Sequence, residues 1–162
     1  MEIERKFLIK ALPEALDRYV SHRIEQAYLC TNPVVRVRRQ DDEFFLTYKG
    51  SGMLMREEYN LPLTQEGYEH LLQKADGTVI AKRRIVIPLE TDGLNAELDL
   101  FEGSLRGLKI VEVEFPDQRT AESFVPPAWF GKDVTFIPDF HNSAMSRMSP
   151  EKVRMFLDHY VR

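Results

Sequence analysis

Charged and apolar side chains alternate along the first segment of the chain. If residues 2–9 form a strand, Glu2, Glu4 and Lys6 share one face, because successive side chains of a strand point to opposite sides. The other face is mostly apolar and carries Phe7. The two carboxylates would lie about 7 Å apart, given the rise of about 3.4 Å per residue. The pattern predicts a strand with one face for ions and one for a core.

The same alternation recurs along most of the chain, whereas helical spacing is confined to four segments. Predicted strands cover residues 2–9, 23–30, 34–39, 43–49, 55–63, 78–87, 94–101 and 108–116. Predicted helices cover residues 11–19, 64–74, 118–124 and a last segment that starts at residue 149. Residues 91–93 are predicted to form a turn, and residues 133–147 show no clear pattern.

Eight strands joined mostly by short turns predict an all-β-dominated α+β fold, with an eight-stranded antiparallel barrel. A small barrel normally fills its interior with apolar side chains. Here one face of most strands is charged, and the opposite face is apolar and can be covered by helices. We therefore expect a closed barrel, or tunnel, with a polar lumen and helices packed outside. Residues 1–162 would form this single domain.

Composition agrees with such a domain. The chain has 162 residues, of which 30% are charged and 43% hydrophobic, as in a globular protein with a sizeable core. The formal net charge of -4 gives no reason to expect binding to nucleic acid or a membrane surface. The single cysteine, Cys30, favours a reducing compartment, and no signal-like or membrane-spanning apolar run is present. We expect a cytoplasmic protein.

The charges of the predicted lumen sort by sign along the chain. If the first strand closes against the last, acidic strands from both ends of the chain form one wall and basic strands form another. The carboxylates are Glu2, Glu4, Glu58, Glu97, Asp99, Glu112 and Glu114. The cations are Lys6, Arg36, Arg38, Lys49, Arg56, Lys82 and Arg84.

Segregated charges of this kind are costly unless a ligand compensates them. Carboxylates suit a hard divalent cation such as Mg2+ or Mn2+, and arginine and lysine suit phosphate oxygens. A metal on one side and cations on the other is the arrangement that phosphoryl transfer requires. The alternative is a structural barrel held by internal salt bridges, in which acids and bases would alternate on neighbouring strands.

Six short motifs resemble, in order and spacing, those of the CYTH family, also called triphosphate tunnel metalloenzymes. They are Glu2-Ile-Glu4-Arg-Lys6, Arg36-Val-Arg38, Thr47-Tyr-Lys49, Lys82-Arg-Arg84, Glu97-Leu-Asp99 and Glu112-Val-Glu114. The resemblance covers residues 2–145 and includes the segment Trp129-Phe-Gly-Lys132. It implies an eight-stranded tunnel, dependence on a divalent metal and small-molecule triphosphate substrates.

The resemblance also implies roles for individual side chains. The triphosphate would be bound by Lys6, Arg36, Arg38, Lys49, Lys82 and Arg84. The metal would be held by Glu2, Glu4, Glu112 and Glu114, with Asp99 as a further ligand. The catalytic residues would be Glu4, Lys6 and Glu114. Glu58 and Glu97 either join the acidic wall or orient a basic neighbour.

One segment departs from the family pattern. After Val134-Thr135, similar proteins usually carry a basic residue followed by Tyr and then Asn, whereas this chain has Pro138-Asp139-Phe140-His141-Asn142. We expect a cation and a hydroxyl to be missing from one tunnel mouth, so that long polyphosphate chains are poor substrates. His141 either substitutes for the missing group or is an ordinary surface histidine, and we favour the second interpretation.

The predicted function is metal-dependent hydrolysis of inorganic triphosphate to diphosphate and phosphate. The family also includes class IV adenylyl cyclases, thiamine triphosphatases and RNA 5′-triphosphatases, but the sequence offers no separate set of residues for a base and a ribose. A different class of function is a polyphosphate- or nucleotide-binding module without turnover, and the double set of carboxylates argues against it. The sequence leaves the choice of metal and the oligomeric state open.

Overall fold

The computed structural model describes residues 1–91 and 93–162, so the predicted turn at residues 91–93 includes Asp92, which lies outside the described residues. Its strands are β1 (Glu2–Ile9), β2 (Val20–Thr31), β3 (Val34–Gln40), β4 (Glu43–Lys49), β5 (Met55–Arg56), β6 (Glu58–Pro62), β7 (Asp76–Pro88), β8 (Asn95–Phe101), β9 (Lys109–Glu114) and β10 (Phe130–Asp133). Its α-helices are α1 (Gln65–Leu72), α2 (Gln118–Ser123), α3 (Asn142–Ser146) and α4 (Pro150–Tyr160). Short 3-10 helices are η1 (Leu16–Arg18), η2 (Gly103–Leu105) and η3 (Pro138–Phe140).

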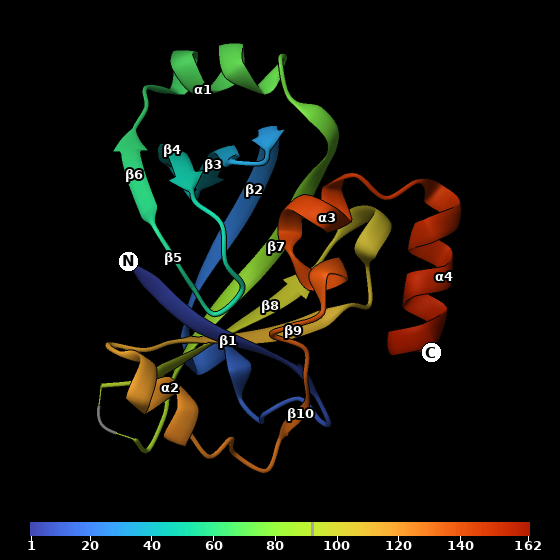
Figure 1. The fold of residues 1–162 in the computed structure, drawn as a ribbon. Helices are drawn as coiled ribbons and strands as arrows, with labels where there is room; N and C mark the ends of the chain where they lie inside the picture. Colours follow the sequence, from blue (N-terminus) through green and yellow to red (C-terminus); the bar gives the residue numbers. More distant parts are fainter. Residues whose placement is uncertain (92) are drawn as a thin grey trace.

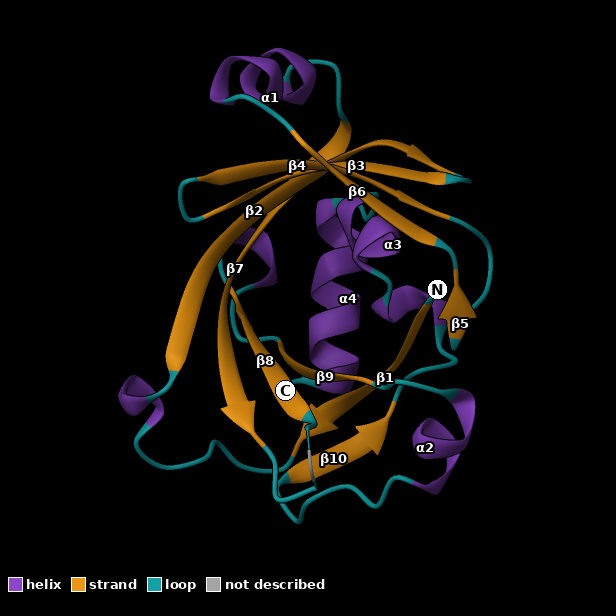
Figure 2. Cartoon of the chain, turned by 90° about the vertical axis from the view of Figure 1, so that its left-hand side faces the viewer, coloured by secondary structure: helices purple, strands orange, loops and turns teal. Residues whose placement is uncertain are grey.

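The strands form one antiparallel sheet that curves into a nearly closed barrel (Figures 1 and 2), which confirms the predicted architecture. The strand order is β10-β1-β9-β8-β7-β2-β3-β4-β6. As expected, the first strand pairs with the last long one, since Glu4 on β1 lies opposite Glu114 on β9. The remaining seam, between β6 and β1, is bridged by β5, where Arg56 lies opposite Glu2.

The barrel has ten described strands instead of eight, for two reasons. The predicted strand 55–63 is divided at Glu57, because β5 pairs with β1 whereas β6 pairs with β4. An additional strand, β10, pairs with the outer edge of β1. The predicted helix at residues 11–19 is wrong, because only the short η1 forms there. Ala15 precedes it with a left-handed φ of 53°, which an α-helix does not allow.

The other three predicted helices lie close to their expected positions, because their N-caps are clear in the sequence. The side chains of Thr64, Asp117 and Ser149 each accept a hydrogen bond from the backbone N–H three residues later. In Figure 1, α1 covers β3 and β4, α2 lies against β1, and α3 and α4 lie at one end of the barrel. Among the described helices, none combines the length and hydropathy that crossing a bilayer requires.

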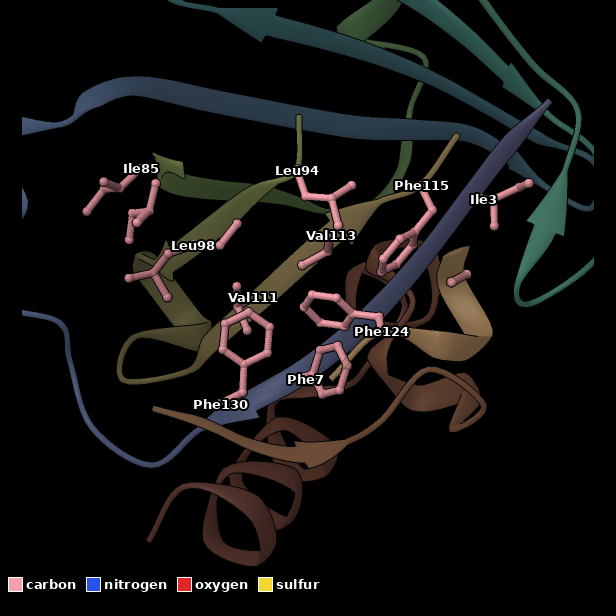
Figure 3. Packing of buried hydrophobic residues seen from close by; sticks show 13 residues of the cluster. Ile3, Phe7, Ile85, Leu94, Leu98, Val111, Val113, Phe115, Phe124 and Phe130 are labelled. Atoms are coloured by element: carbon pink, nitrogen blue, oxygen red, sulfur yellow. The ribbon is translucent and has the colours of Figure 1, made fainter. Parts of the chain in front are cut away.

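The apolar faces of the strands point outward beneath these helices, so the barrel is inverted as predicted. In the largest cluster, Phe7 from β1 packs with Val111 and Val113 from β9 and with Phe124 beyond α2 (Figure 3). A second cluster lies beneath α4 and includes Phe156. Each large side chain buried in this way stabilises the fold by about 1.5–3 kcal/mol. The outer core leaves the inward faces of the strands free for charged residues.

Candidate active site

The lumen contains a cavity of about 210 Å³, lined almost entirely by charged and polar side chains. This volume is below the roughly 300–1,000 Å³ of pockets that hold drug-sized organic ligands. The predicted site residues that line it are Glu2, Glu4, Lys6, Arg36, Arg38, Lys49, Arg84, Glu112 and Glu114. Lys82 and Asp99 share the inward face but are buried behind this lining. Alternation along the strands thus brings nine of the eleven predicted residues to one cavity.

Acids and bases pair where the acidic strand β8 meets the basic strand β7. The carboxylate of the fully buried Asp99 lies 2.6 Å from Lys82 Nζ and 2.7 Å from Arg84 Nε. Arg84 also contacts Glu97 at 3.0 Å and Glu112 at 3.2 Å. Burial works against the Arg84 cation, but these three carboxylates outweigh it and raise the pKa of its guanidinium. Acidic and basic residues are therefore carried by different strands, but their side chains form ion pairs where β7 and β8 meet.

A second set of ion pairs lies at the seam between β6 and β1 and includes Lys49 from the neighbouring strand β4. Lys49 Nζ lies 2.9 Å from a carboxylate oxygen of Glu2 and 3.1 Å from one of Glu58. Arg56 Nε is 3.6 Å from Glu2. Burial, followed by the charge of the neighbouring Glu4, raises the pKa of the Glu2 carboxyl. The seam therefore depends on cations and carboxylates in close contact rather than on backbone hydrogen bonds alone.

Two arginines on β3 differ from the other cations, because no described carboxylate pairs with either. Arg36 is 5% exposed, and among the described residues it donates only to the Thr47 hydroxyl at 3.3 Å and has a buried Nε–H without a partner. Arg38 donates to the side-chain oxygen of Gln26, a neutral amide. Burial, and then the charges of Arg36 and Arg84, lower the pKa of Arg38 to about 9. Such an environment favours an anion beside these guanidinium groups.

Glu4 and Glu114, across the cavity from these arginines, are carboxylates with little compensating positive charge nearby. Glu114 is exposed to the cavity mouth and forms no ion pair with another described residue. Burial and the neighbouring carboxylates, Glu58 first, raise the pKa of Glu114. Glu4, opposite it on β1, pairs within the described part of the chain only with Lys6, at a long distance of 3.7 Å. These carboxylates therefore form a locally negative site.

The donor set fits a hard divalent cation, although the described residues do not form a complete cage. No three His, Cys, Asp or Glu side chains in the described part of the chain are arranged to hold a metal. Mg2+ commonly needs only one or two protein carboxylates, because waters and substrate phosphates supply the other ligands. Glu4 and Glu114 meet that requirement, since they lie opposite each other and have no strong cation partner among residues 1–91 and 93–162.

The segment after β10 also reaches the cavity, which the sequence did not reveal. His141, Asn142 and Ser143 line it, so the interpretation of His141 as a surface histidine is wrong. Burial and the charges of Lys6, Arg56 and Lys49, opposed by Glu112, lower the pKa of His141 to about 4. The imidazole is therefore neutral at pH 7.

The side chains of the two residues thought to alter the tunnel mouth do not line the cavity. Phe140 is fully buried in the core beneath α4, and Asp139 pairs with Lys152 at 3.6 Å on the outside. The Phe140 carbonyl oxygen accepts a long hydrogen bond of 3.5 Å from Lys6 Nζ, and Asn142 accepts one of 3.4 Å from Lys82. Two predicted substrate-binding lysines are thus supported by this C-terminal segment.

Comparisons with known proteins agree with this geometry. The sequence model of the CYTH domain matches residues 1–126. The chain belongs to the CYTH family. It is 38% identical over 152 residues to an inorganic triphosphatase of Nitrosomonas europaea, covering 92% of this chain and 99% of that protein. It is 34% identical over 148 residues to an inorganic triphosphatase of Acetivibrio thermocellus, covering 88% and 90%.

The fold also matches a solved structure over nearly the whole chain. The crystal structure of the inorganic triphosphatase NE1496 superposes with a TM-score of 0.69 at 35% identity, covering 93% of this chain and 97% of that one. The six motifs lie within the part matched by the CYTH domain, whereas His141 and Asn142 lie beyond residue 126. Part of the cavity lining is thus supplied by residues outside the matched domain.

Proposed function

We propose that this CYTH protein hydrolyses inorganic triphosphate to diphosphate and phosphate, with Mg2+ or Mn2+ as its cofactor. One observation carries the proposal. One cavity holds two arginines, Arg36 and Arg38, for which the structure describes no carboxylate partner, and two carboxylates, Glu4 and Glu114, for which it describes no strong cation partner. A polyanion would satisfy the arginines and a divalent cation would satisfy the carboxylates. The inorganic triphosphatases that resemble this chain over nearly its whole length support the assignment.

In this proposal the basic wall holds the substrate. Arg36 and Arg38 donate to the phosphate oxygens, because their charges are not already compensated. Lys6 and Lys49 sit where the walls meet, and their contacts with carboxylates at 2.9–3.7 Å can be exchanged for phosphate oxygens. Phosphoryl transfer depends mainly on positioning and on stabilising charge, which these cations supply.

The acidic wall would hold the metal and the attacking water. We place the metal first on Glu4 and Glu114, because Glu2 and Glu112 are engaged by neighbouring cations. A bound divalent cation neutralises phosphate charge and lowers the pKa of a coordinated water. The oxygen of the attacking water would form a bond to a terminal phosphorus and release its proton to solvent. The bridging P–O bond to that phosphorus would break, the bridging oxygen would leave with the diphosphate, and Lys6 would stabilise the charge that develops on it.

Asp99 has a different role in this proposal from that of a metal ligand. It is fully buried and contacts both Lys82 and Arg84. We assign it the orientation of these two cations, which places Arg84 at the cavity wall. Lys82 would act on the substrate only through a rearrangement of its contacts with Asp99 and Asn142.

The whole of residues 1–162 would work as one domain, in the cytoplasm.

A groove beside the cavity favours a second candidate, the hydrolysis of triphosphate esters. It has a volume of about 390 Å³ and shares Val34, Arg56, His141 and Ser143 with the cavity. Pro33 and Met53 add apolar lining. An organic substituent on a terminal phosphate could lie there. The cavity itself is charged throughout, so we rank the unsubstituted triphosphate first.

The proposal is tested by steady-state kinetics on triphosphate, ATP, thiamine triphosphate and long-chain polyphosphate, each with Mg2+, Mn2+ or a chelator. We expect diphosphate and phosphate as products of triphosphate, a requirement for metal, and a kcat/KM at least about 10-fold higher than for ATP. That ratio corresponds to the loss of one charge-assisted contact of about 1.5–3 kcal/mol. Equal or better turnover of ATP would favour the ester hydrolase, and binding without turnover would favour a binding module.

A further inference from the structure

Gln26 lies behind the basic wall and touches one of its two uncompensated arginines. It is on β2, directly opposite Arg38 on β3, and its side chain is fully buried. Its Oε1 accepts two hydrogen bonds from the Arg38 guanidinium, from Nε at 2.9 Å and from Nη2 at 2.6 Å. Gln26 does not line the cavity, whereas Arg38 does. Any effect of Gln26 on a ligand in the cavity must therefore pass through Arg38.

A neutral partner at this position is electrostatically unusual in this protein. Arg84 on the neighbouring strand β7 is held by three carboxylates, and Lys49 by two. A glutamate in place of Gln26 would have almost the same shape and would form a charge-assisted pair with the buried guanidinium. The glutamine leaves the positive charge of Arg38 uncompensated.

The amide itself carries a second cost. Because its oxygen faces Arg38, its nitrogen faces away, and that Nε2 group is buried without a hydrogen-bond partner among the described residues. An unsatisfied buried donor is destabilising. Neither feature is explained by stability, since a glutamate would remove both the unpaired donor and the uncompensated charge. Both are explained if the charge of Arg38 has to remain available to a ligand.

We propose that Gln26 is a positioning residue for substrate binding. It fixes Nε and one Nη2–H of Arg38 with a neutral acceptor, so that the remaining guanidinium donors and the full positive charge face the cavity. The inference rests on the proposed triphosphatase function and adds a requirement to it, namely that residue 26 stays uncharged. Ligands of this site would then be selected for their negative charge as well as their shape.

The test compares Gln26→Glu and Gln26→Met, both close to glutamine in size, in the chain of residues 1–162. Gln73→Glu serves as the charge-matched control, because Gln73 is exposed at the end of α1. For each protein we would measure KM and kcat for triphosphate with Mg2+, the Kd for triphosphate by calorimetry without metal, and the melting temperature of the ligand-free protein.

The two variants are expected to weaken binding with opposite effects on stability. Gln26→Glu should raise the melting temperature while raising KM and Kd about 10-fold or more, with a smaller change in kcat. Gln26→Met should lower the melting temperature and also raise KM and Kd, because Arg38 loses both of its hydrogen bonds. Gln73→Glu should leave KM and Kd unchanged.

The outcomes separate this inference from the proposed function. If Gln26→Glu folds with a higher melting temperature but binds triphosphate as the wild type does, the positioning role is wrong. If Gln26→Met does not fold, the KM and Kd of Gln26→Glu still test the positioning role, because this variant retains the contact with Arg38. If the wild-type protein neither binds nor hydrolyses triphosphate, the proposed function itself fails, and with it the inference that rests on it.

Discussion

Arg36 offers a sharp test, because the structure predicts opposite effects of its removal on stability and on activity. The side chain is 5% exposed, its Nε–H has no partner among the described residues, and its only described hydrogen bond is the 3.3 Å contact with Thr47. Arg36→Met keeps the apolar length of the side chain and removes the buried charge. The ligand-free protein therefore loses an electrostatically unfavourable group, whereas the bound substrate loses a charged hydrogen-bond donor.

The magnitudes follow from the contacts that change. An unsatisfied buried polar group costs about 1–3 kcal/mol, and for a chain of this size each kcal/mol shifts the melting temperature by about 2–4 °C. We therefore expect the melting temperature to rise by about 2–12 °C. A charge-assisted contact with phosphate contributes about 1.5–3 kcal/mol, so kcat/KM for triphosphate should fall by about 10- to 150-fold.

Arg39 provides the matched control on the same strand, since it points outward and its side chain is 46% exposed. Arg39→Met should leave kcat/KM within about 3-fold of the wild-type value, because Arg39 does not line the cavity and surface substitutions usually change the free energy of unfolding by no more than about 0.5 kcal/mol. Thermal melts by circular dichroism and phosphate-release kinetics measure both quantities. A variant Arg36→Met that melts earlier and retains full activity would refute the reasoning, because Arg36 would then be a structural cation.

Two further predictions concern the groups around the metal and the C-terminal segment. Glu114→Gln should raise the Mg2+ concentration needed for half-maximal activity, and an unchanged metal titration would remove Glu114 from the proposed ligand set. Because the pKa of His141 is about 4 in the native protein and about 6.5 when unfolded, the unfolded chain binds more protons as the pH falls through this window. Wild-type stability should therefore decrease between about pH 6.5 and 4 more than that of His141→Gln, and parallel denaturant titrations that coincide would contradict the buried, neutral imidazole.

Most of the site could be predicted because side chains in a strand alternate with a period of two. Once Glu2, Glu4 and Lys6 are assigned to the lumen, the apolar neighbours on β1 must face the core, and a shift of one residue would exchange the two faces. The structure confirms this alternation for β1 and for β9, whose Glu112 and Glu114 face the same cavity.

Alternation does not predict which of the inward-facing side chains reach the cavity, or which strands pair at the seam of the barrel. Glu97 and Asp99 have the same parity, yet only Glu97 lines the cavity, because Asp99 is buried between Lys82 and Arg84. The division of residues 55–63 into β5 and β6 depends on which neighbour each half reaches, and alternation carries no such information.

The segment after β10 is fixed by tertiary contacts that local sequence does not encode. The backbone N–H of Lys6 donates to the Thr135 hydroxyl at 3.0 Å, and the N–H of Val134 donates to the Lys6 carbonyl oxygen at 2.9 Å. These bonds hold the chain beside β1 and direct η3 and α3 to the end of the barrel (Figure 2). The position of His141 in the cavity follows from that path and not from the residues next to it.

The central claim is that one cavity holds triphosphate on its basic wall and a divalent metal on its acidic wall. The most direct measurement is a crystal structure of the protein with Mn2+ and a non-hydrolysable triphosphate analogue, with anomalous scattering used to locate the metal. We predict phosphate oxygens within hydrogen-bond distance of Arg36 and Arg38, and Mn2+ coordinated by Glu4 and Glu114. Phosphate groups bound away from these arginines, or a metal held outside the cavity, would contradict the account.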